Sequence, residues 1–432
     1  MRRKYLFVGQ VLLLLLVVGA LYYGSHHITR LPASIRLPNS ESSDNSAAGG
    51  TTGTTETSYT YSGILSAENI TRYVNSIFDA KSEDLPRLKC PDIPSPSRYD
   101  SLKSSPDDGR QIKYYFAIDL RDTVPLLPRL LGSVVETIKF LGPASCALSI
   151  VEGNSHDGTY DILQAIRASF NDLDTTYFLR SSAVDPKEGD RIAKLAELRN
   201  LALQPLLDGN VPGADQDTTV VFLNDVAACT EDILELVHQR RRLGADMTCG
   251  LDWVYVGRDP TFYDVWVARG MNGDSFFEIP PDGNWNSAWN LFWNNDAARA
   301  SLAAHRPFQV FSCWNGAAVF AAKPLLDAAS RIRFRGPRDG ECSQGEPELF
   351  CKDMWFHGYG KIAVVPSVNL EYSDANAQRI KDLKGYTSRW TAEAGDEDDE
   401  DKIAWQTTPP ETVKCIPSYD SQSFRPWNET LG

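Results

Sequence analysis

The sequence predicts an α/β protein whose central sheet is mostly parallel and flanked by helices. The main evidence is the alternation of short apolar runs with amphipathic helical patterns between residues 113 and 244. This alternation is typical of parallel strands, which need crossover helices between them. Polar and acidic residues also follow several apolar runs, at the position where open α/β sheets bind ligands. The expected strands cover residues 113–120, 146–153, 175–181 and 218–225.

The chain is long and acidic. It has 432 residues, of which 42% are hydrophobic, and this is enough to bury at least one large core. Its formal net charge is −14. A general nucleic-acid-binding protein would carry a basic surface instead, so that class of function is excluded.

The N-terminus has the features of a membrane anchor. Residues 5–23 form an apolar run long enough to cross a bilayer, and the basic residues in 1–4 predict that this end stays in the cytosol. A cleaved signal peptide is the alternative. Residues 24–60 contain few apolar side chains and are expected to form a flexible stem. A lumenal lead-in region, 61–112, follows.

Residues beyond the anchor are expected to reach the lumen of the secretory pathway. Asn69 and Asn428 each begin an N-glycosylation sequon, unless the match is due to chance. All eight cysteines lie beyond the apolar run and none forms a CxxC pair. The sequence therefore predicts one or more disulfides and no zinc site, with the pairing left open.

The stretch SIVEGNSHDGTYDIL, residues 149–163, ends an apolar strand with acidic, hydroxyl and glycine residues. Glu152 and Asp157 are therefore candidates for ligand binding at the carboxyl end of that strand. Asp157 would also serve as a cap for the helix that follows. Capping accounts for Asp157 better than for Glu152.

Arg199 lies within the apolar stripe of a helix predicted over residues 191–207. A buried guanidinium needs an anion, and its planar fork suits a diphosphate as well as a carboxylate. A structural pair with a buried carboxylate is the alternative. Asn200 follows it directly.

Several other polar residues follow or interrupt apolar runs. Asn224 and Asp225 end the strand at 218–225, where Asp225 could cap the next helix. The turn Trp314-Asn315-Gly316 lies between two apolar runs and could contact a sugar. Further along, four ionisable side chains occur close together: Glu346, Glu348, Asp353 and His357. A solvent-exposed acidic helix is the alternative for this last group.

Three of these motifs resemble elements of GT-A-type nucleotide-sugar glycosyltransferases. They are the acid Glu152 followed by Ser155-His156-Asp157-Gly158-Thr159, the Arg199-Asn200 pair, and Asn224-Asp225 in place of Asp-x-Asp. Together with segments such as CGLDW, FYDVWVARGMNGDSFF and SCWNGAAVF, they resemble the fungal family of cryptococcal α-1,3-mannosyltransferases and capsule-associated proteins. The resemblance covers residues 113–373.

The resemblance implies a GT-A-like fold, with a catalytic domain at 113–385 and a C-terminal extension at 386–432 that carries an acidic loop. It implies transfer of mannose from GDP-mannose to a mannose-containing acceptor in α-1,3 linkage, with retention of configuration and help from Mn²⁺ or Mg²⁺. It also implies a single-pass type II Golgi membrane protein, with the catalytic domain in the lumen. The alternatives are a transferase for another nucleotide sugar and a non-catalytic capsule-assembly protein, which Asn224 in place of an acid keeps open.

The resemblance also assigns roles to the candidate residues. Catalysis is expected of Asp225, Asp353 and Glu348, and the metal is expected near Asp225, Asn224 and His357. Binding of nucleotide or sugar is expected of the remaining candidates: Asp119, Glu152, Asp157, Arg199, Asn200, Trp314, Asn315 and Gly316.

Overall fold

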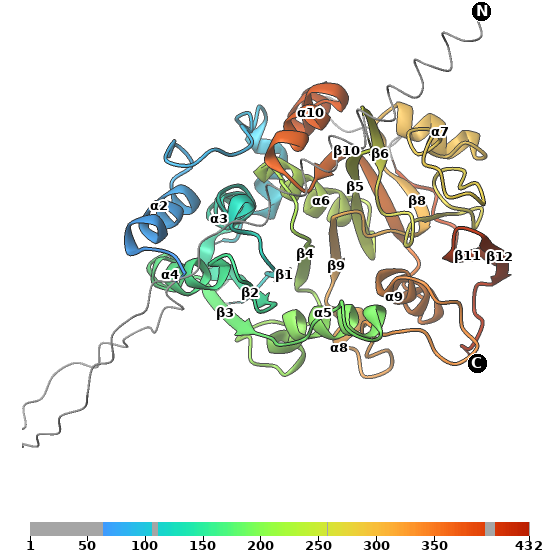
Figure 1. The fold of residues 1–432 in the computed structure, drawn as a ribbon, viewed down its shortest axis with the longest axis horizontal. Helices are drawn as coiled ribbons and strands as arrows, with labels where there is room; N and C mark the ends of the chain where they lie inside the picture. Colours follow the sequence, from blue (N-terminus) through green and yellow to red (C-terminus); the bar gives the residue numbers. More distant parts are fainter. Residues whose placement is uncertain (1–63, 106–110, 257, 394–401, 432) are drawn as a thin grey trace, which may run out of the picture. The chain divides into compact units, whose positions relative to one another are not determined.

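A ten-stranded sheet forms the centre of the molecule. The computed structural model describes residues 64–105, 111–256, 258–393 and 402–431. The strand order along the sheet is β3-β2-β1-β4-β9-β5-β10-β8-β7, with β6 paired to β5 (Figure 1). The α/β class predicted from the alternating pattern is confirmed.

The first half of the sheet is parallel. Its strands are β1 (Tyr114–Leu120), β2 (Cys146–Glu152), β3 (Thr176–Ser181) and β4 (Thr219–Leu223). They fall where the apolar runs predicted them. β1 pairs in parallel with both β2 and β4, and β2 pairs in parallel with β3.

The second half of the sheet mixes directions. β9 pairs antiparallel with β4 and β5, β5 pairs in parallel with β10, and β8 pairs antiparallel with β10 and β7. The expectation of a mostly parallel sheet is therefore correct for the first half alone. The strands of this half are β5 (Met247–Val256), β6 (Asp259–Phe262), β7 (Arg269–Gly270), β8 (Phe308–Ser312), β9 (Ala317–Ala321) and β10 (Ile362–Glu371).

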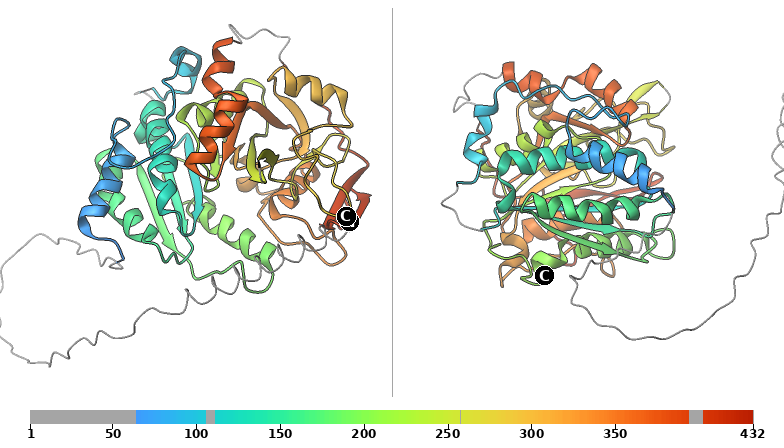
Figure 2. Two further views of the ribbon diagram at one scale, coloured as in Figure 1. Left: turned by 45° about the horizontal axis from the view of Figure 1, so that its top comes forward. Right: turned by 90° about the vertical axis from the view of Figure 1, so that its left-hand side faces the viewer.

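Helices cover both faces of the sheet, giving three layers (Figures 1 and 2). One face packs against α3 (Leu127–Leu141), α4 (Thr159–Asp172) and α6 (Thr230–Arg242). The other packs against α5 (Arg191–Leu207) and α9 (Glu346–Phe356). Alternate residues of β1 enter the two cores, because successive side chains of a strand point to opposite faces.

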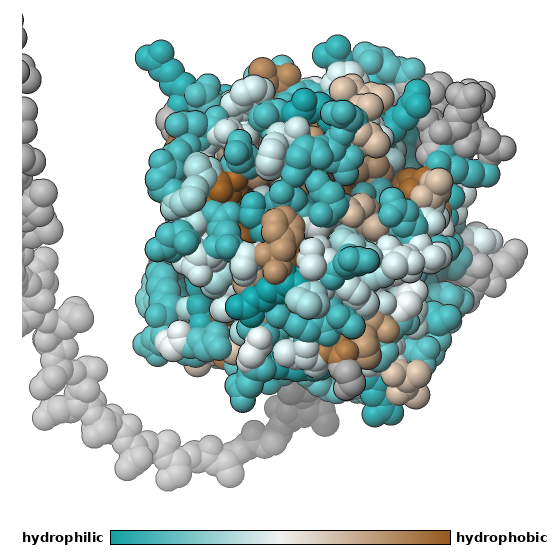
Figure 3. Space-filling view, turned by 90° about the vertical axis from the view of Figure 1, so that its right-hand side faces the viewer, coloured by the Kyte–Doolittle hydropathy of each residue, from teal (hydrophilic) through white to brown (hydrophobic). Residues whose placement is uncertain are grey.

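Shorter elements complete the domain. Three 3-10 helices lie at Pro96–Leu102, Val124–Leu126 and Pro143–Ser145. The remaining α-helices are α2 (Ala67–Phe78), α7 (Asp296–Ala303), α8 (Lys323–Leu326), α10 (Asp374–Lys384) and α11 (Thr387–Glu393). A separate hairpin consists of β11 (Thr412–Ser418) and β12 (Ser421–Pro426). The face on the side of this hairpin shows mostly hydrophilic residues with apolar ones scattered among them (Figure 3).

The anchor expected at residues 5–23 and the stem expected at 24–60 lie outside the described residues. Within the part of the chain that is described, no helix is both long and apolar enough to cross a membrane. The lead-in region expected at 61–112 is described over most of its length and contains α2, which packs on α3.

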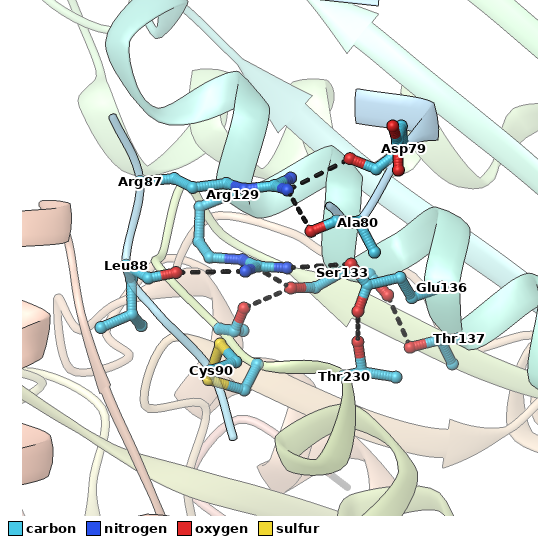
Figure 4. Close-up of polar contacts among 12 residues, drawn as sticks. Asp79, Ala80, Arg87, Leu88, Cys90, Arg129, Ser133, Glu136, Thr137 and Thr230 are labelled. Atoms are coloured by element: carbon cyan, nitrogen blue, oxygen red, sulfur yellow. Dashed lines mark hydrogen bonds and ion pairs between the residues drawn. A yellow bond between two sulfur atoms is a disulfide. The ribbon is translucent and has the colours of Figure 1, made fainter. Parts of the chain in front are cut away.

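Hydrogen bonds connect the lead-in region to the sheet domain (Figure 4). Arg129 of α3 is buried and donates from Nη1 to the carbonyl of Leu88 at 3.1 Å. The same guanidinium donates from Nε to Ser133 at 3.0 Å. Arg87 donates to the carbonyls of Asp79 and Ala80, which closes the turn after α2. The described residues of the lead-in region are therefore part of the folded body.

Three disulfides join distant parts of the chain, as the cysteine content predicted. They are Cys90–Cys229, Cys249–Cys313 and Cys342–Cys415. Cys146 and Cys351 are free and buried. The two sequon residues, Asn69 and Asn428, are exposed.

We expect the Cys90–Cys229 disulfide to contribute roughly 2–5 kcal/mol to stability, because it closes a long loop of the unfolded chain. The double variant Cys90→Ser/Cys229→Ser should lose that amount in urea unfolding, and a protease should then cut between residues 79 and 105. Cys146→Ala, which breaks no disulfide, is the control and should lose less. Equal stability of the double variant and the unmodified protein would contradict this role.

Candidate active site

The carboxyl ends of three parallel strands bring the first group of polar residues together. The register of β1 and β2 places Leu120 opposite Glu152, so Asp119 lies one residue before the shared edge of the sheet. β4 ends at Leu223, and Asn224 and Asp225 follow directly. β9 runs in the opposite direction, so the turn that precedes it lies at this same edge, where Asn224 donates its N–H to the carbonyl of Gly316 at 2.9 Å.

Arg199 of α5 lies buried at the centre of this edge. Its Nε is 2.7 Å from Oε1 of Glu346, and its Nη1 donates to Oδ1 of Asn224 at 3.2 Å. The guanidinium carbon lies 4.6 Å from the centroid of the Trp314 ring. Burial alone would lower the pKa of Arg199, but the charges of Glu346 and Asp119 outweigh it and raise that pKa. The arginine is thus held as a fixed cation.

Two carboxylates, Asp119 and Asp225, lie close enough to Arg199 to interact with its charge. Asp119 Oδ1 is buried without a hydrogen bond among the described residues and lies 3.9 Å from Nη1 of Arg199. Burial, followed by the charge of Asp119, raises the pKa of Asp225 to about 6. Two nearby carboxylates that disfavour each other's charge are a suitable place for a cation.

The donor set fits a divalent cation held partly by substrate. In the described residues, no cluster of three or more His, Cys, Asp or Glu side chains could hold a metal ion. Mg²⁺, however, usually takes one or two protein carboxylates and completes its shell with water and phosphate oxygens. Asp119 and Asp225 meet that need. Asn224 does not, because its Oδ1 already accepts hydrogen bonds from Arg199 and from Nε1 of Trp314.

Three cavities meet at Asp225, which lines all of them. The central cavity, of about 390 Å³, also contains Arg199 and Trp314. The β2-side cavity, of about 410 Å³, includes Gly153 and Lys187. The α10-side cavity, of about 630 Å³, reaches α10. Asp119 lines the first two cavities.

Asp264 is a further carboxylate on the wall of the central cavity. It lies in the segment after β6, and its Oδ2 accepts the backbone N–H of Asn315 at 2.8 Å. Burial raises the pKa of Asp264 to about 6. Behind it, Asp252 of β5 is buried, and its Oδ2 accepts a hydrogen bond from the hydroxyl of Tyr372 at 2.5 Å. Burial, followed by the charge of Asp264, raises the pKa of Asp252 well above its ordinary value.

Aromatic side chains form much of the remaining wall of the central cavity. Tyr263 and Trp266 are 46% and 36% exposed, so their rings are open to a ligand. Trp285 also lines the cavity. An apolar and aromatic wall with a few fixed polar groups is the usual composition of a small-molecule site.

The structure brings five of the predicted residues together in the central cavity: Asp119, Arg199, Asn224, Asp225 and Trp314. Other predicted residues lie beside this cavity, and their side chains form hydrogen bonds with neighbouring parts of the chain. Glu152 accepts hydrogen bonds from Ser155 N at 2.5 Å and Ser181 Oγ at 2.9 Å.

The other neighbouring residues shape the loops around the site. Asp157 accepts from the N–H groups of Val124 and Thr159, and Asn200 binds the backbone of Phe334. Asn315 is fully buried, and its amide donates to the carbonyl of Gly250. Gly316 has a φ of +81°, and a Cβ there would lie 3.1 Å from Val226.

Three candidates lie away from the three cavities. Asp353 forms an ion pair with Arg335, His357 is exposed after the end of α9, and Glu348 lies 3.6 Å from Arg269. Among the described residues that line the central, β2-side and α10-side cavities, none of the three is present. Asp353 lies away from the cavities because it is seven residues beyond Glu346 on the same helix, which is about 10 Å along the helix axis.

Sequence reasoning did not assign a site role to Asp264 or Glu346. Glu346 belongs to the acidic group before α9, but only its place in the first turn of that helix brings it to Arg199. Asp264 lies in the FYDVWVARG segment, where an acidic residue among aromatic ones could have indicated a ligand site.

Comparison with known proteins places the chain in a family. The family model described as Cryptococcal mannosyltransferase 1 matches residues 113–353. The chain is also 36% identical over 349 residues to the alpha-1,3-mannosyltransferase CMT1 of Cryptococcus neoformans var. neoformans, covering 77% of this chain and 73% of that protein. The chain belongs to the cryptococcal mannosyltransferase family. It is an enzyme of the glycosyltransferase class, as the motifs predicted.

Solved structures similar to this family member are more distant. Staphylococcus aureus TarS, residues 1–349, aligns with a TM-score of 0.36 and 12% identity over 63% of this chain and 65% of that one. The mannosyltransferase PcManGT from Pyrobaculum calidifontis, in complex with GDP-Man and Mn²⁺, aligns with a TM-score of 0.36 and 13% identity over 64% and 61%. The chain thus spans less than two thirds of the length of each.

We expect Arg199→Met to cost about 3–5 kcal/mol, because Glu346 would remain buried without its partner. The double variant Arg199→Met/Glu346→Gln removes both charges and should recover at least about half of that loss. Urea unfolding of the two single variants and the double variant gives the coupling energy of the pair. If the double variant were no more stable than Arg199→Met, the ion pair would not account for the burial of Arg199.

Proposed function

We propose that this chain transfers mannose from GDP-mannose to a mannose-containing acceptor in α-1,3 linkage, with retention of configuration and with a divalent cation, during fungal glycan or polysaccharide synthesis. The observation that carries the proposal is the meeting of three cavities at Asp225, with Asp119 and Arg199 beside it. Such a junction can hold a nucleotide, a sugar and an acceptor around one group. The relative named an alpha-1,3-mannosyltransferase supports the sugar and the linkage.

The β2-side cavity suits the nucleoside of the donor. It is lined by the ends of β1 and β2 and by Lys187 and Arg191. Arg191 also lines the central cavity, so a diphosphate passing from one cavity to the other would run between Arg191 and Arg199. Guanidinium groups bind phosphate oxygens through paired N–H donors.

Asp119 and Asp225 would hold Mn²⁺ or Mg²⁺ beside this diphosphate. A bound divalent cation supplies neutralisation of the charge that builds on the leaving diphosphate. The cavity also keeps Arg199 fixed beside the same charge, since three groups orient it before the donor arrives. Charge stabilisation by groups already in place requires little reorganisation during the reaction.

The sugar and the acceptor would occupy the other two spaces. The central cavity presents Tyr263, Trp266 and Trp285 to the mannose. The α10-side cavity is the largest of the three and would take the acceptor glycan beside Asp225. The bond from the mannose anomeric carbon to the phosphate oxygen breaks, and its electron pair leaves with GDP. The acceptor oxygen forms the new glycosidic bond, and its proton passes to the released GDP or to water.

We assign to Asp264 the stabilisation of the positive charge that develops on the mannose ring as the diphosphate leaves. Glycosyl transfer passes through an oxocarbenium-like state that a nearby carboxylate favours. Asp264 lies on the wall of the central cavity, and the backbone of Asn315 fixes its orientation. The assignment holds for a covalent intermediate and for proton transfer to the leaving phosphate on the same face.

Two other functions would use the same fold. A different donor sugar would keep the diphosphate site and change the fit at the aromatic wall. A non-catalytic capsule-assembly protein is favoured by Asn224, which stands where related enzymes carry an acid. The retained pair of Asp119 and Asp225 favours an enzyme over this last alternative.

We expect Asp225→Asn and Asp119→Asn each to reduce mannose transfer from GDP-mannose to α-mannobiose by at least about 100-fold, because each removes a carboxylate from the cation site. EDTA should abolish transfer by the unmodified protein, and Mn²⁺ should restore it. Asp208→Asn is the matched control, since Asp208 is exposed at the end of α5, and it should leave the rate unchanged.

Donor binding separates the alternatives. Protection of the protein against thermal unfolding by GDP-mannose, without transfer, would require a different acceptor. If another nucleotide sugar protected the protein and GDP-mannose did not, that nucleotide sugar would be the donor. No protection by any nucleotide sugar would overturn the proposed donor site.

We expect the transfer rate to rise with pH and to level off above about pH 6. Asp264 and Asp225 must both be ionised, and burial raises the pKa of each to about 6, so protonation below that pH removes activity. Saturating Mn²⁺ should keep Asp225 ionised. The fall in transfer rate at low pH, the acid limb of the profile, should then report the protonation of Asp264 alone. Asp264→Asn should lower the plateau by at least about 100-fold and remove that limb. An unchanged acid limb in this variant would contradict the assignment.

A further inference from the structure

A fourth cavity, the arginine cavity, lies at the far end of α9 from the candidate active site. Its volume is about 290 Å³. None of the described residues that line it lines a cavity containing Asp225. Its charged and ionisable lining residues are Arg331, Arg333, Arg335, Arg338, Asp353 and His357.

The sequence RIRFR, residues 331–335, explains why three arginines line one cavity. Ile332 and Phe334 are 3% exposed and enter the large core, whereas the arginines between them are not buried. In an extended segment every second side chain lies on the same side, and this pattern accounts for Arg333 and Arg335. Arg331 has a φ of +45° and belongs to the turn before them, where its N–H donates to the carbonyl of Asp327. The apolar residues anchor the segment, and the arginines face the cavity.

The carboxylates beside the arginine cavity are already neutralised. Nε of Arg335 lies 2.7 Å from Oδ2 of Asp353, and its Nη1 lies 2.6 Å from Glu341. Lys352 also pairs with Glu341, at 2.6 Å. Although burial opposes the effect, Arg335 and Lys352 lower the pKa of Glu341 to about 2. The charges of the cations Arg335 and Lys352 therefore balance those of the carboxylates Asp353 and Glu341.

The other arginines of the cavity have no such balance. Arg333 donates to the carbonyls of Leu325 and Ile332, and Arg338 donates to the carbonyl of Thr430. Within the described parts of the chain, neither they nor Arg331 form an ion pair with a carboxylate. Burial, followed by the charge of Arg331, lowers the pKa of Arg333, although the charge of Asp208 opposes this shift.

Three guanidinium groups that form no ion pair within the described residues therefore line this concave surface, in a chain with a net charge of −14. Concave surfaces with charges of one sign concentrate ligands of the opposite sign. Guanidinium groups are suited to planar or tetrahedral oxyanions, because they offer several N–H donors in a fixed plane. The cavity volume exceeds what a bare phosphate ion needs.

We propose that the arginine cavity is a second ligand site, which binds the phosphate or carboxylate group of an anionic sugar. Arg331, Arg333 and Arg338 supply the charge, and the remaining space takes the sugar. The binding of an oxyanion is inferred from these residues alone. The inference that the oxyanion belongs to a sugar rests on the proposed function.

The same segment touches the candidate active site. The ring of Phe334 lies 5.3 Å from that of Trp314 and 5.7 Å from the guanidinium carbon of Arg199, measured to the Phe334 centroid. Asn200 binds both the N–H and the carbonyl of Phe334. A ligand that orders residues 331–335 would therefore also order the wall behind Arg199.

The test measures binding of mannose 6-phosphate and galacturonate to the full-length protein by calorimetry, with GDP present to compete at the active site. Arg331→Ala/Arg333→Ala should weaken binding at least about tenfold. The control Arg299→Ala/Arg389→Ala removes the same charge from two exposed arginines outside the cavity and should change binding less than about twofold. Arg331→Lys/Arg333→Lys should retain part of the affinity, since charge remains without the planar fork.

The two probes separate the two oxyanions, because binding of only one of them identifies the group that the cavity prefers. No saturable binding of either probe, or equal loss in the cavity variant and the control, would overturn the proposal. Thermal unfolding of each variant shows whether the fold is intact. These outcomes do not depend on transfer activity, so failure of the proposed function would leave them readable.

Discussion

The charge of Arg199 is the constraint on which the candidate active site depends. A buried guanidinium is stable only when anions or acceptors surround it. Here α9 supplies Glu346, the end of β4 supplies Asn224, and the end of β1 supplies Asp119. One helix and two strands are therefore fixed relative to α5 by a single side chain. The space left between them is the central cavity.

Most of the first half of the fold was predictable from the sequence. Strands β1 to β4 alternate with amphipathic helices, and each apolar run is long enough to identify its strand. The antiparallel insertion of β9 between β4 and β5 was not predictable in this way. Direction is set by tertiary contacts along the edges of strands, and the pattern of apolar residues in AAVFA is the same for either direction.

The candidate site shows the same division. Arg199 and Asp225 could be singled out because one is a charged group in an apolar stripe and the other ends a strand, whereas Asp119 was named through the family resemblance alone. Asp353 and His357 shared a helix face in sequence, but that helix begins at the site and carries them away from it. Glu346 stabilises Arg199 through a contact between residues 147 positions apart, which no local pattern reveals.

The Cys90–Cys229 disulfide has a practical consequence for the choice of a soluble fragment. Cys229 lies four residues after Asp225 and caps α6, so the disulfide links the lead-in region covalently to the segment that follows Asp225. A fragment that begins at the first strand would leave Cys229 unpaired and would remove the backbone carbonyl that Arg129 binds. Expression boundaries should therefore be drawn before α2, and the host compartment should be oxidising.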